Sequence, residues 1–417
     1  MSMNILRVEQ PCPQCGGSVV LAADDRLLTC PYCKVKSFLL ASGGPFRYAL
    51  PNRAKEQTLL LHAPYLRFKG NIFSVTDAGV SHKVLDTTQD GSGLPGLPAS
   101  LGVRPQAMPL LRVHSGSKGR FLPFSGRIRD IFEKATKLRK LMEDRPDETM
   151  YHQAYIGETL SFIYLPLLPK NDILFDAVQG QPLPGSSAIG LKSEPFQHTW
   201  QPHFRAALCP RCGGNLEGEG DCLAPICSNC DIVWQIGKEA LERTVCKVIP
   251  GGSRTPALHL PFWRIAAELP ALGISSFADF AERTNQPFIV RPEWRSQQMR
   301  FWVPAFKLRP EIFLRTAKQI TISQRLFGPE RDMHLKTTAN PYPVTLPLSE
   351  ARQSLKVILA ASAASGRNIF SRLPEAEAEM QTAALVYLPF DDRQLDWTQS
   401  HTGAVIGKSV LQFGRKL

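Results

Sequence analysis

The residues best suited to chemistry are eight cysteines, arranged as four Cys-x-x-Cys pairs. The pair Cys12–Cys15 precedes Cys30–Cys33, and Cys209–Cys212 precedes Cys227–Cys230, with fourteen residues between the pairs in both sets. Two such pairs at this spacing are typical of a tetrahedral site with four thiolate ligands. The repeated spacing predicts two Zn²⁺ per chain. Mononuclear iron uses similar ligand sets and stays an alternative.

A second interpretation concerns the segment TCPYCKVKSF, residues 29–38, because Cys-Pro-Tyr-Cys also occurs in dithiol redox centres. A reactive cysteine of that kind needs a helix N-terminus, whose dipole lowers the pKa of the thiol. The stretch Lys34–Leu40 runs directly into Ala41–Pro45 and is too short for this helix. Thiol–disulfide exchange through Cys30 and Cys33 is therefore the weaker hypothesis.

Short strands must bring each set of cysteines together. We expect strands at Ser18–Leu21 and Leu27–Thr29, with Ala22–Asp25 as the turn between them. The Gly-Gly that follows each first pair can supply left-handed backbone. Residues 9–40 and 206–237 resemble zinc ribbons, which are common in transcription factors, RNA polymerase subunits and uncharacterised prokaryotic double zinc-ribbon proteins. This resemblance implies a metal-held fold and no particular activity.

The chain also has the pattern of two copies of one module. The shift of 197 residues that relates the cysteine sets carries Leu61–Phe68 onto Leu258–Ile265. Two further pairs of similar segments are Arg120–Phe124 with Arg300–Phe306, and Ile163–Leu167 with Val386–Phe390. The expected domains are a zinc ribbon at 1–45, an α+β module at 46–200, a second ribbon at 201–245 and a second module at 246–417.

We expect each larger module to be α+β, with an antiparallel sheet and a few helices. The repeated proline–aromatic segments are short and bounded by Gly and Pro, which is typical of strands. Proline cannot donate to a strand ladder, so the sequence predicts these strands at sheet edges or bends. Helices are expected at Gly126–Met142 and Pro310–Ile320, and from a cap at Ser349 to Ala364.

Composition and motifs exclude several classes of protein. The 417 residues are 43% hydrophobic and 21% charged, which indicates a globular protein. We find neither a signal-peptide pattern nor an apolar run of membrane-spanning length, and expect a soluble, cytoplasmic protein. Phosphate-binding loops, metalloprotease helices and nucleophile elbows are also absent from the sequence. The sequence therefore favours a non-enzymatic protein.

The net charge of +12 is shared equally between the two halves. Residues 1–200 contain 23 basic and 17 acidic residues, and residues 201–417 contain 26 basic and 20 acidic residues. The excess concentrates around residues 112–140 and 291–325, where aromatic residues are interleaved. We expect an interaction or scaffold protein, a subunit or adaptor that binds other proteins. Nucleic-acid binding is the alternative, and an anionic membrane surface is a weaker third. The candidate residues for an anionic partner are Arg120, Arg127, Arg129, Lys137, Lys140, Arg300, Lys307 and Arg309.

Overall fold

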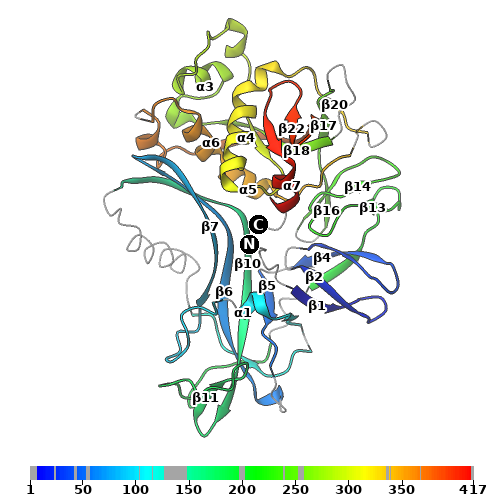
Figure 1. Ribbon diagram of the computed structural model, residues 1–417, viewed down its shortest axis with the longest axis vertical. Coiled ribbons are helices and arrows are strands. Elements are labelled where there is room, and N and C mark those ends of the chain that lie inside the picture. The colour runs from blue at the N-terminus through cyan, green and yellow to red at the C-terminus, as the bar shows by residue number, and fades with distance from the viewer. Residues whose placement is uncertain are drawn as a thin grey trace.

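The computed structural model describes residues 7–22, 25–41, 45–52, 57–102, 104–114, 116–125, 148–196, 202–237, 240–251, 258–334, 338, 340–366 and 368–414. Within these residues the chain is a mixed α+β structure in which strands predominate (Figure 1). The chain forms two large sheets, one from each half, and smaller sheets in or beside which three of the four cysteine pairs lie. The expected α+β class is confirmed at this level.

The first large sheet has the strand order β2-β1-β8-β5-β10-β6-β7, with β9 beside β6 and β11 beside β10. Its long central strands, β6 and β10, form an antiparallel ladder with register shifts at Met150/His152 and Ile156/Thr159. The strands are β1 (Arg7–Pro11), β2 (Ser18–Ala22), β5 (Phe46–Ala49), β6 (Leu61–Thr76), β7 (Gly79–Asp90), β8 (Leu110–Arg112), β9 (Arg120–Phe121), β10 (Met150–Lys170) and β11 (Ile173–Asp176).

The second large sheet has the order β19-β18-β21-β17-β20, and β22 joins β21 and β23. Here β18 and β21 form the central antiparallel pair. The strands are β17 (Cys246–Val248), β18 (Leu258–Glu268), β19 (Arg300–Pro304), β20 (Arg331–Asp332), β21 (Glu379–Arg393), β22 (Asp396–Gln399) and β23 (Val405–Gly407).

The central strand pairs of the two sheets share one register. The shift of 197 residues relates β6 to β18, whereas β10 and β21 are related by a shift of 223 residues (387 − 164). In both sheets each proline pairs with a tyrosine or a histidine at the same step of the ladder. The corresponding pairs are Pro64–Tyr164 with Pro261–Tyr387, and His62–Pro166 with His259–Pro389. A slip of one residue in the pairing would move every side chain to the other face of the sheet. The agreement therefore shows that the matching segments are paired in the same register in both halves.

The turns that follow β11 and β22, the strands that pair with the ends of β10 and β21, correspond as well. The Asp176 carboxylate accepts hydrogen bonds from the backbone N–H groups two and three residues later, at 2.8 and 3.1 Å. The Gln399 side-chain oxygen accepts from the same two positions, at 2.9 and 2.6 Å. Each turn then reaches a glycine with positive φ, Gly180 in one half and Gly403 in the other. The correspondence therefore extends beyond the matching sequence.

The expected match between Arg120–Phe124 and Arg300–Phe306 is wrong. Pro304 pairs with Phe262, as Asp90 pairs with Tyr65, so β19 corresponds to the end of β7. The segment at Arg120 instead runs parallel to β6 on its own short strand. Similar proline and aromatic content produced the false match, because composition carries no information about register.

The counterpart of Pro123 is Pro343. The N–H two residues after Pro123 bonds the carbonyl of Gly91 (2.8 Å), and the N–H two residues after Pro343 bonds the carbonyl of Ala305 (2.9 Å). Gly91 and Ala305 directly follow the corresponding ends of β7 and β19. Both prolines therefore lie in the segment that packs beside the end of the central strand.

The prolines of the central strands lie inside the sheets, so the expected edge position is also wrong. Strand β6 lies between β10 and β7, and β18 lies between β21 and β19. The carbonyl of Pro64 accepts from Gly91, just beyond the end of β7, and Pro261 accepts from Ala305, just beyond β19. In an antiparallel ladder, the N–H and C=O of one residue point to the same neighbouring strand. The N–H that Pro64 and Pro261 lack would therefore point to the end of β7 and of β19, respectively.

The helices belong mostly to the second half. They are α1 (Arg104–Ala107), α3 (Phe277–Arg283), α4 (Pro310–Ser323), α5 (Leu348–Gln353), α6 (Leu355–Ser362) and α7 (Lys408–Gly414). Short 3₁₀ turns are η1 (Gln57–Leu59), η2 (Pro270–Leu272), η3 (Pro292–Arg295), η4 (Gln324–Leu326) and η5 (Phe370–Arg372). In the part of the chain that is described, none of the helices has the length and hydropathy to cross a membrane.

Two of the expected helices can be compared with the structure. The helix predicted from Pro310 is confirmed, with the proline in its first turn. The helix predicted from Ser349 is divided at Ser354, and Pro347 stands at its N-cap position in place of Ser349. The Ser354 hydroxyl donates to the carbonyl of Ala351 (2.6 Å), which competes with helix continuation. Gly126–Met142 lies outside the described residues.

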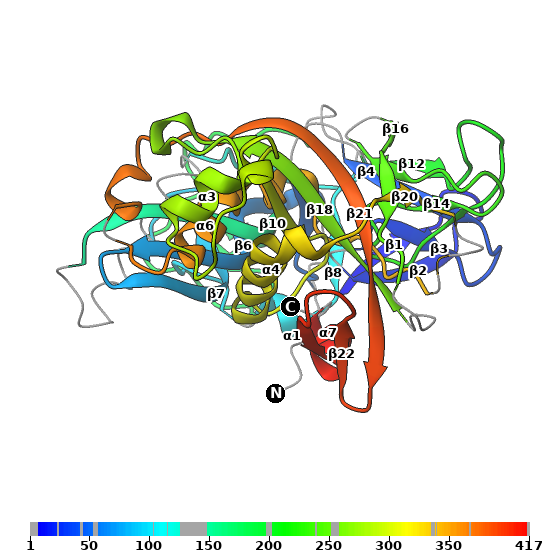
Figure 2. The same cartoon turned by 90° about the horizontal axis from the view of Figure 1, so that it is seen from above.

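One hydrophobic core joins the two halves. Helices α4, α5 and α6 contact strands of the first sheet as well as elements of the second half. Figure 2 shows α4 and α6 beside strands of the first sheet. Buried residues near the far ends of β6 and β10, including Phe73, Val75, Ala154 and Ile156, belong to the same core as α4 and α6. The halves are therefore held together by apolar packing in addition to strand pairing.

This packing makes a first prediction at Phe73, which is fully buried with its ring 5.9 Å from that of Phe313. Phe73→Ala should lower the free energy of unfolding by about 3–5 kcal/mol, since it removes a large buried side chain. Denaturant unfolding measures this value. Val84→Ala on β7 is the control, because Val84 is 45% exposed. A loss below about 1 kcal/mol for Phe73→Ala would contradict a shared core.

Candidate metal centres

The pair Cys12–Cys15 lies in the turn between β1 and β2 of the first large sheet, and the other three pairs lie in or beside small sheets. Strand β3 (Leu27–Thr29) pairs with β4 (Lys36–Ala41), β13 (Leu216–Glu217) with β14 (Ile226–Cys227), and β15 (Trp234–Ile236) with β16 (Leu241–Arg243). Both strands expected in the first ribbon are present. They do not pair with each other as expected, since β2 pairs with β1 and β3 with β4.

Each of the four Cys-x-x-Cys pairs occupies the same type of turn. The N–H of the first cysteine bonds the carbonyl five residues later, and its carbonyl accepts from the N–H four residues later. These bonds are 2.8 and 2.9 Å at Cys12, 3.1 and 3.0 Å at Cys30, 2.8 and 2.9 Å at Cys209, and 2.9 and 3.1 Å at Cys227. The turn directs both sulfurs of a pair to one side.

The fourth residue after the first cysteine has left-handed backbone in all four turns. Gly16 and Gly213 occupy it after the first pairs, with φ of +72° and +70°, as the sequence predicted. Lys34 and Asp231 occupy it after the second pairs, with φ of 62° and 56°. A residue with a Cβ is strained in this region, so the surrounding turn has to hold it there. These two left-handed positions were not predicted from the sequence.

The eight sulfurs form two compact groups. In the first, Cys12 Sγ lies 3.8 Å from Cys33 Sγ, and Cys15 Sγ lies 3.7 Å from Cys30 Sγ. In the second, the Sγ–Sγ distances are 3.7 Å for Cys209–Cys230, 3.5 Å for Cys212–Cys227 and 3.7 Å for Cys212–Cys230. In each group all four sulfurs lie within 4.8 Å of one another.

These distances fit a tetrahedral metal ion. A Zn–S bond of about 2.3 Å places tetrahedral sulfurs about 3.8 Å apart, which matches both groups. A disulfide would bring two sulfurs to about 2.0 Å, far closer than any pair here. The donor set of four cysteines suits Zn²⁺, and also mononuclear iron. The sulfur groups can therefore each hold one metal ion.

The sulfurs differ in exposure, and backbone N–H groups reach two sulfurs of the second group. The first cysteine of every pair is buried, whereas Cys15 and Cys212 are exposed. The N–H of Gly214 donates to Cys212 Sγ (3.4 Å), and the N–H of Asn229 donates to Cys227 Sγ (3.4 Å). The bond from Gly214, helped by the Asn229 side chain, lowers the pKa of Cys212 to about 6. Such donors compensate part of the charge that four thiolates bring together.

The two centres are connected by strand pairing across the halves. Strand β12 (Pro202–Ala206) precedes the second cysteine set but pairs with β4 of the first ribbon. The N–H groups of Arg26 and Leu27 also donate to the carbonyl of Gly220, at 2.6 and 2.8 Å. Lys36 forms an ion pair with Glu217 (3.0 Å). The ribbons are therefore interlocked, and the first also joins the large sheet through β1.

Each ribbon also contributes apolar side chains to the buried cluster of the other ribbon. Phe204 of β12 packs against the cluster that contains Cys12 and Cys30. In return, Leu27 and Phe38 of the first ribbon share a buried cluster with Cys209 and Cys227. Each sulfur group is thus partly enclosed by the other half of the chain, so the two groups are not clearly tandem small ribbons.

The redox interpretation of Cys30–Cys33 lacks the helix it requires. The residues that follow this pair form strand β4, so Cys30 does not stand at a helix N-terminus. The remaining cysteines lie apart from both sulfur groups. Cys222 is 2% exposed, and the Cys246 thiol donates to the sulfur of Met333 (3.2 Å). Burial raises the pKa of Cys222 to about 12, which disfavours a thiolate there.

The structure distributes the described basic candidates over several places. Arg120 on β9 donates to the Ser193 hydroxyl (2.9 Å), Arg300 opens β19, and Arg309 precedes α4. Lys307 lines a cavity between the halves together with Lys69, a residue that the sequence analysis did not identify. The other candidates, Arg127, Arg129, Lys137 and Lys140, lie outside the described residues. Their role in binding an anionic partner stays a prediction.

Comparisons of the chain with protein-family models, with curated proteins and with solved structures find no match. The assignment of the two centres therefore depends on the residues and geometry described above.

We predict two Zn²⁺ per chain, measured by elemental analysis of protein purified without added metal. Cys15→Ser should remove one ion, because serine is a poor zinc ligand and Cys15 is exposed, so little packing is lost. Cys222→Ser and Cys246→Ser are the controls and should leave the metal content unchanged. One ion in the wild type, or iron in place of zinc, would refute the assignment.

The interlocked ribbons make a further prediction. Loss of the first metal through Cys15→Ser should expose amides of β12 to hydrogen exchange, because β12 pairs with β4 of that ribbon. Hydrogen–deuterium exchange with mass spectrometry can compare peptides from residues 202–206 and 27–41. Both should lose protection together, while β21 in the second sheet stays protected. Faster exchange confined to residues 7–41 would show that the ribbons are independent.

Proposed function

We propose that both cysteine groups bind Zn²⁺ as structural sites. A zinc ion with four protein thiolates has no open position for water or substrate, and the thiolates of such sites are largely inert. The proposal is supported by sulfur separations of 3.5–3.8 Å in both groups and by four matching turns. The shared register of the large sheets further supports an internal duplication of one ribbon-and-sheet module.

We propose that the chain acts as a non-enzymatic interaction protein, a subunit or adaptor that binds other proteins. The observation that supports this best is apolar exposure on and beside the metal-held ribbons. Tyr32 is 67% exposed between the cysteines of one pair, and Val20 (57%) and Leu208 (49%) lie on neighbouring ribbon segments. Large apolar side chains at rigid, exposed sites are typical of protein-binding surfaces.

Nucleic-acid binding is the second candidate, favoured by one observation, the net charge of +12 with a pI near 9.3. Basic side chains that neutralise phosphates release counterions, so such binding weakens steeply with salt. The described candidates Arg120, Arg300 and Arg309 belong to three different elements. Charge alone is only the first step of an argument for nucleic-acid recognition.

We predict that the tagged protein retains a partner protein through washing with 0.5 M salt, because apolar contacts resist screening. The double variant Val20→Ser with Tyr32→Ser should lose this partner and keep two metal ions, since both side chains are exposed. Ile289→Ser is the matched control, because Ile289 is 90% exposed and lies between α3 and η3, outside the ribbons. A partner that survives the double substitution would place the surface elsewhere.

The nucleic-acid alternative predicts a different outcome. Arg127, Arg129, Lys137 and Lys140 replaced together by Ala should then reduce the slope of log K against log salt by about 3–4 units on duplex DNA, at roughly 0.9 per phosphate contact. Fluorescence anisotropy with labelled DNA and RNA measures this slope. On the interaction-protein proposal, the wild type binds both only weakly near physiological salt. Sub-micromolar binding that the quadruple variant loses would overturn that proposal.

A further inference from the structure

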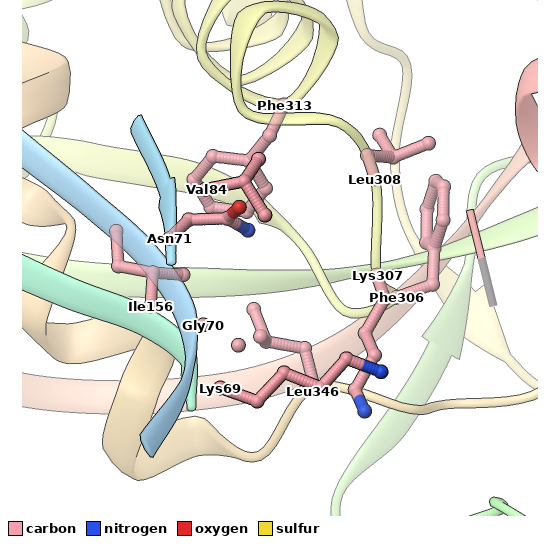
Figure 3. A pocket seen from close by; sticks show the side chains of 11 residues that line it. Lys69, Gly70, Asn71, Val84, Ile156, Phe306, Lys307, Leu308, Phe313 and Leu346 are labelled. Atoms are coloured by element: carbon pink, nitrogen blue, oxygen red, sulfur yellow. The ribbon is translucent and has the colours of Figure 1, made fainter. Parts of the chain in front are cut away.

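Two cavities in the described part of the chain differ strongly in size. One, of about 20 Å³, lies between the halves and has room for a single water molecule (Figure 3). The other, of about 360 Å³, lies within the first half and is lined in part by Gly16 of the first cysteine turn. A cavity of this size can take a small organic molecule. The rest of its lining comes mainly from β1, β5, β8 and the segment 113–121.

One part of the lining of this larger cavity is a row of paired strand residues. Glu9 of β1 pairs with Leu111 of β8, and Leu111 pairs with Ala49 of β5. Residues that pair directly lie on the same face of a sheet, so the row presents the Glu9 carboxylate beside an apolar surface. Leu111 is 42% exposed, whereas Ala49 is buried. The sheet holds the backbone of Glu9 in place, because β1 is paired on both sides.

The segment 113–121, which carries Lys118, is held by a buried histidine. His62 is 5% exposed, and burial lowers its pKa, which favours the neutral ring. Its Nε2 donates to the carbonyl of Lys118 (3.1 Å), since a carbonyl oxygen only accepts. The same ring stacks on Phe121, with the ring centroids 4.5 Å apart. The N–H of His114 also donates to the Ser117 hydroxyl oxygen (3.0 Å), so the backbone on both sides of the lysine is fixed.

The cavity brings together two opposite charges that do not pair with each other. Glu9 and Lys118 both line it and both are exposed, and no ion pair joins them in the described part of the chain. A ligand that has one ammonium and one carboxylate group can contact both residues, each at the end of opposite charge. The Ser117 hydroxyl, whose oxygen accepts from His114, can donate its own hydrogen to a carboxylate.

A third charged residue of the lining points elsewhere. The guanidinium of Arg112 lies over the rings of Phe46 and Tyr48, at 5.0 and 5.5 Å from their centroids. Residues 53–56 and 115, which are close in sequence to lining residues, lie outside the described residues. The two opposite charges at the cavity are therefore considered by their positions and not by a net charge.

The apolar part of the lining belongs to the first half. In the second half, Val248 of β17 occupies the position that Ala49 occupies in β5. Val248 pairs with Arg331, whereas Ala49 pairs with Leu111. An arginine therefore stands where the first half has an exposed leucine, so the two copies of the module differ at this place.

We propose that the cavity lined by β1, β8 and the segment 113–121 binds an apolar amino acid, free or at the ends of a short peptide, through both of its charged groups. The ammonium group would lie at Glu9, the carboxylate at Lys118 and the apolar side chain against Leu111. Because both charged residues are exposed, each ionic contact is partly screened, and the buried apolar surface adds to the affinity. This site goes beyond the proposed zinc sites and the proposed partner surface.

The test uses the full-length, metal-loaded protein and calorimetric titration with leucine and, separately, with leucyl-leucine. Two analogues of leucine each lack one charge, since N-acetyl-leucine has no ammonium group and leucinamide has no carboxylate. Each analogue should bind the wild type about fivefold or more weakly than leucine, because it loses one charged hydrogen bond. The lower Kd of leucine or leucyl-leucine shows whether the ligand is a free amino acid or a peptide.

Two variants assign each charge to its residue. In Glu9→Gln, leucine should bind no more tightly than N-acetyl-leucine, because the ammonium group has lost its partner. In Lys118→Gln, leucine should bind no more tightly than leucinamide. Glu293→Gln and Lys170→Gln are the matched controls, because both residues are exposed and neither lines the cavity.

Two results would overturn the proposal. One is the absence of binding of both leucine and leucyl-leucine by the wild type. The other is equal affinity of the wild type for leucine and its two analogues, which would show that the charged groups are not recognised. Metal content should stay at the wild-type value in every variant, because the substituted residues belong to neither sulfur group. Failure here therefore leaves the proposed zinc sites and partner surface unaffected.

Discussion

Mutual repulsion among four sulfurs is the constraint on which the structure depends at each cysteine group. Four thiolates less than 5 Å apart require a cation, since N–H donors such as that of Gly214 compensate only part of their charge. The ribbon strands are two to six residues long and could not hold a fold by themselves. Metal binding supplies folding free energy in such modules, and β12 would carry that contribution into the second half.

The halves are joined at two separate places. At one, β12 pairs with β4 and the ribbons exchange Phe204, Leu27 and Phe38 between their buried clusters. At the other, helices α4–α6 pack against the far ends of β6 and β10. The cavity with Lys69 and Lys307 belongs to this second junction. The junction of the two ribbons and the apolar junction together join the two sheets.

The sequence was informative where a local pattern has a single structural solution. Cys-x-x-Cys spacing identified both sulfur groups, and the proline–aromatic repeat gave the correct register for Pro64, Pro166 and their counterparts. Non-local features could not be predicted. The pairing of β12 with β4 joins segments more than 160 residues apart in the sequence. The match of Arg120–Phe124 to β19 failed because composition does not encode register. Lys34 and Asp231 are left-handed only because the whole turn holds them there.

The central claim is that both cysteine groups are closed four-thiolate zinc centres that interlock the ribbons. X-ray absorption spectroscopy at the zinc edge of the purified protein tests it most directly. The account predicts a single shell of four sulfurs at about 2.3 Å around zinc, without nitrogen or oxygen ligands. Oxygen or nitrogen in the first shell, or sulfur–sulfur contacts at about 2.0 Å from disulfides, would contradict it.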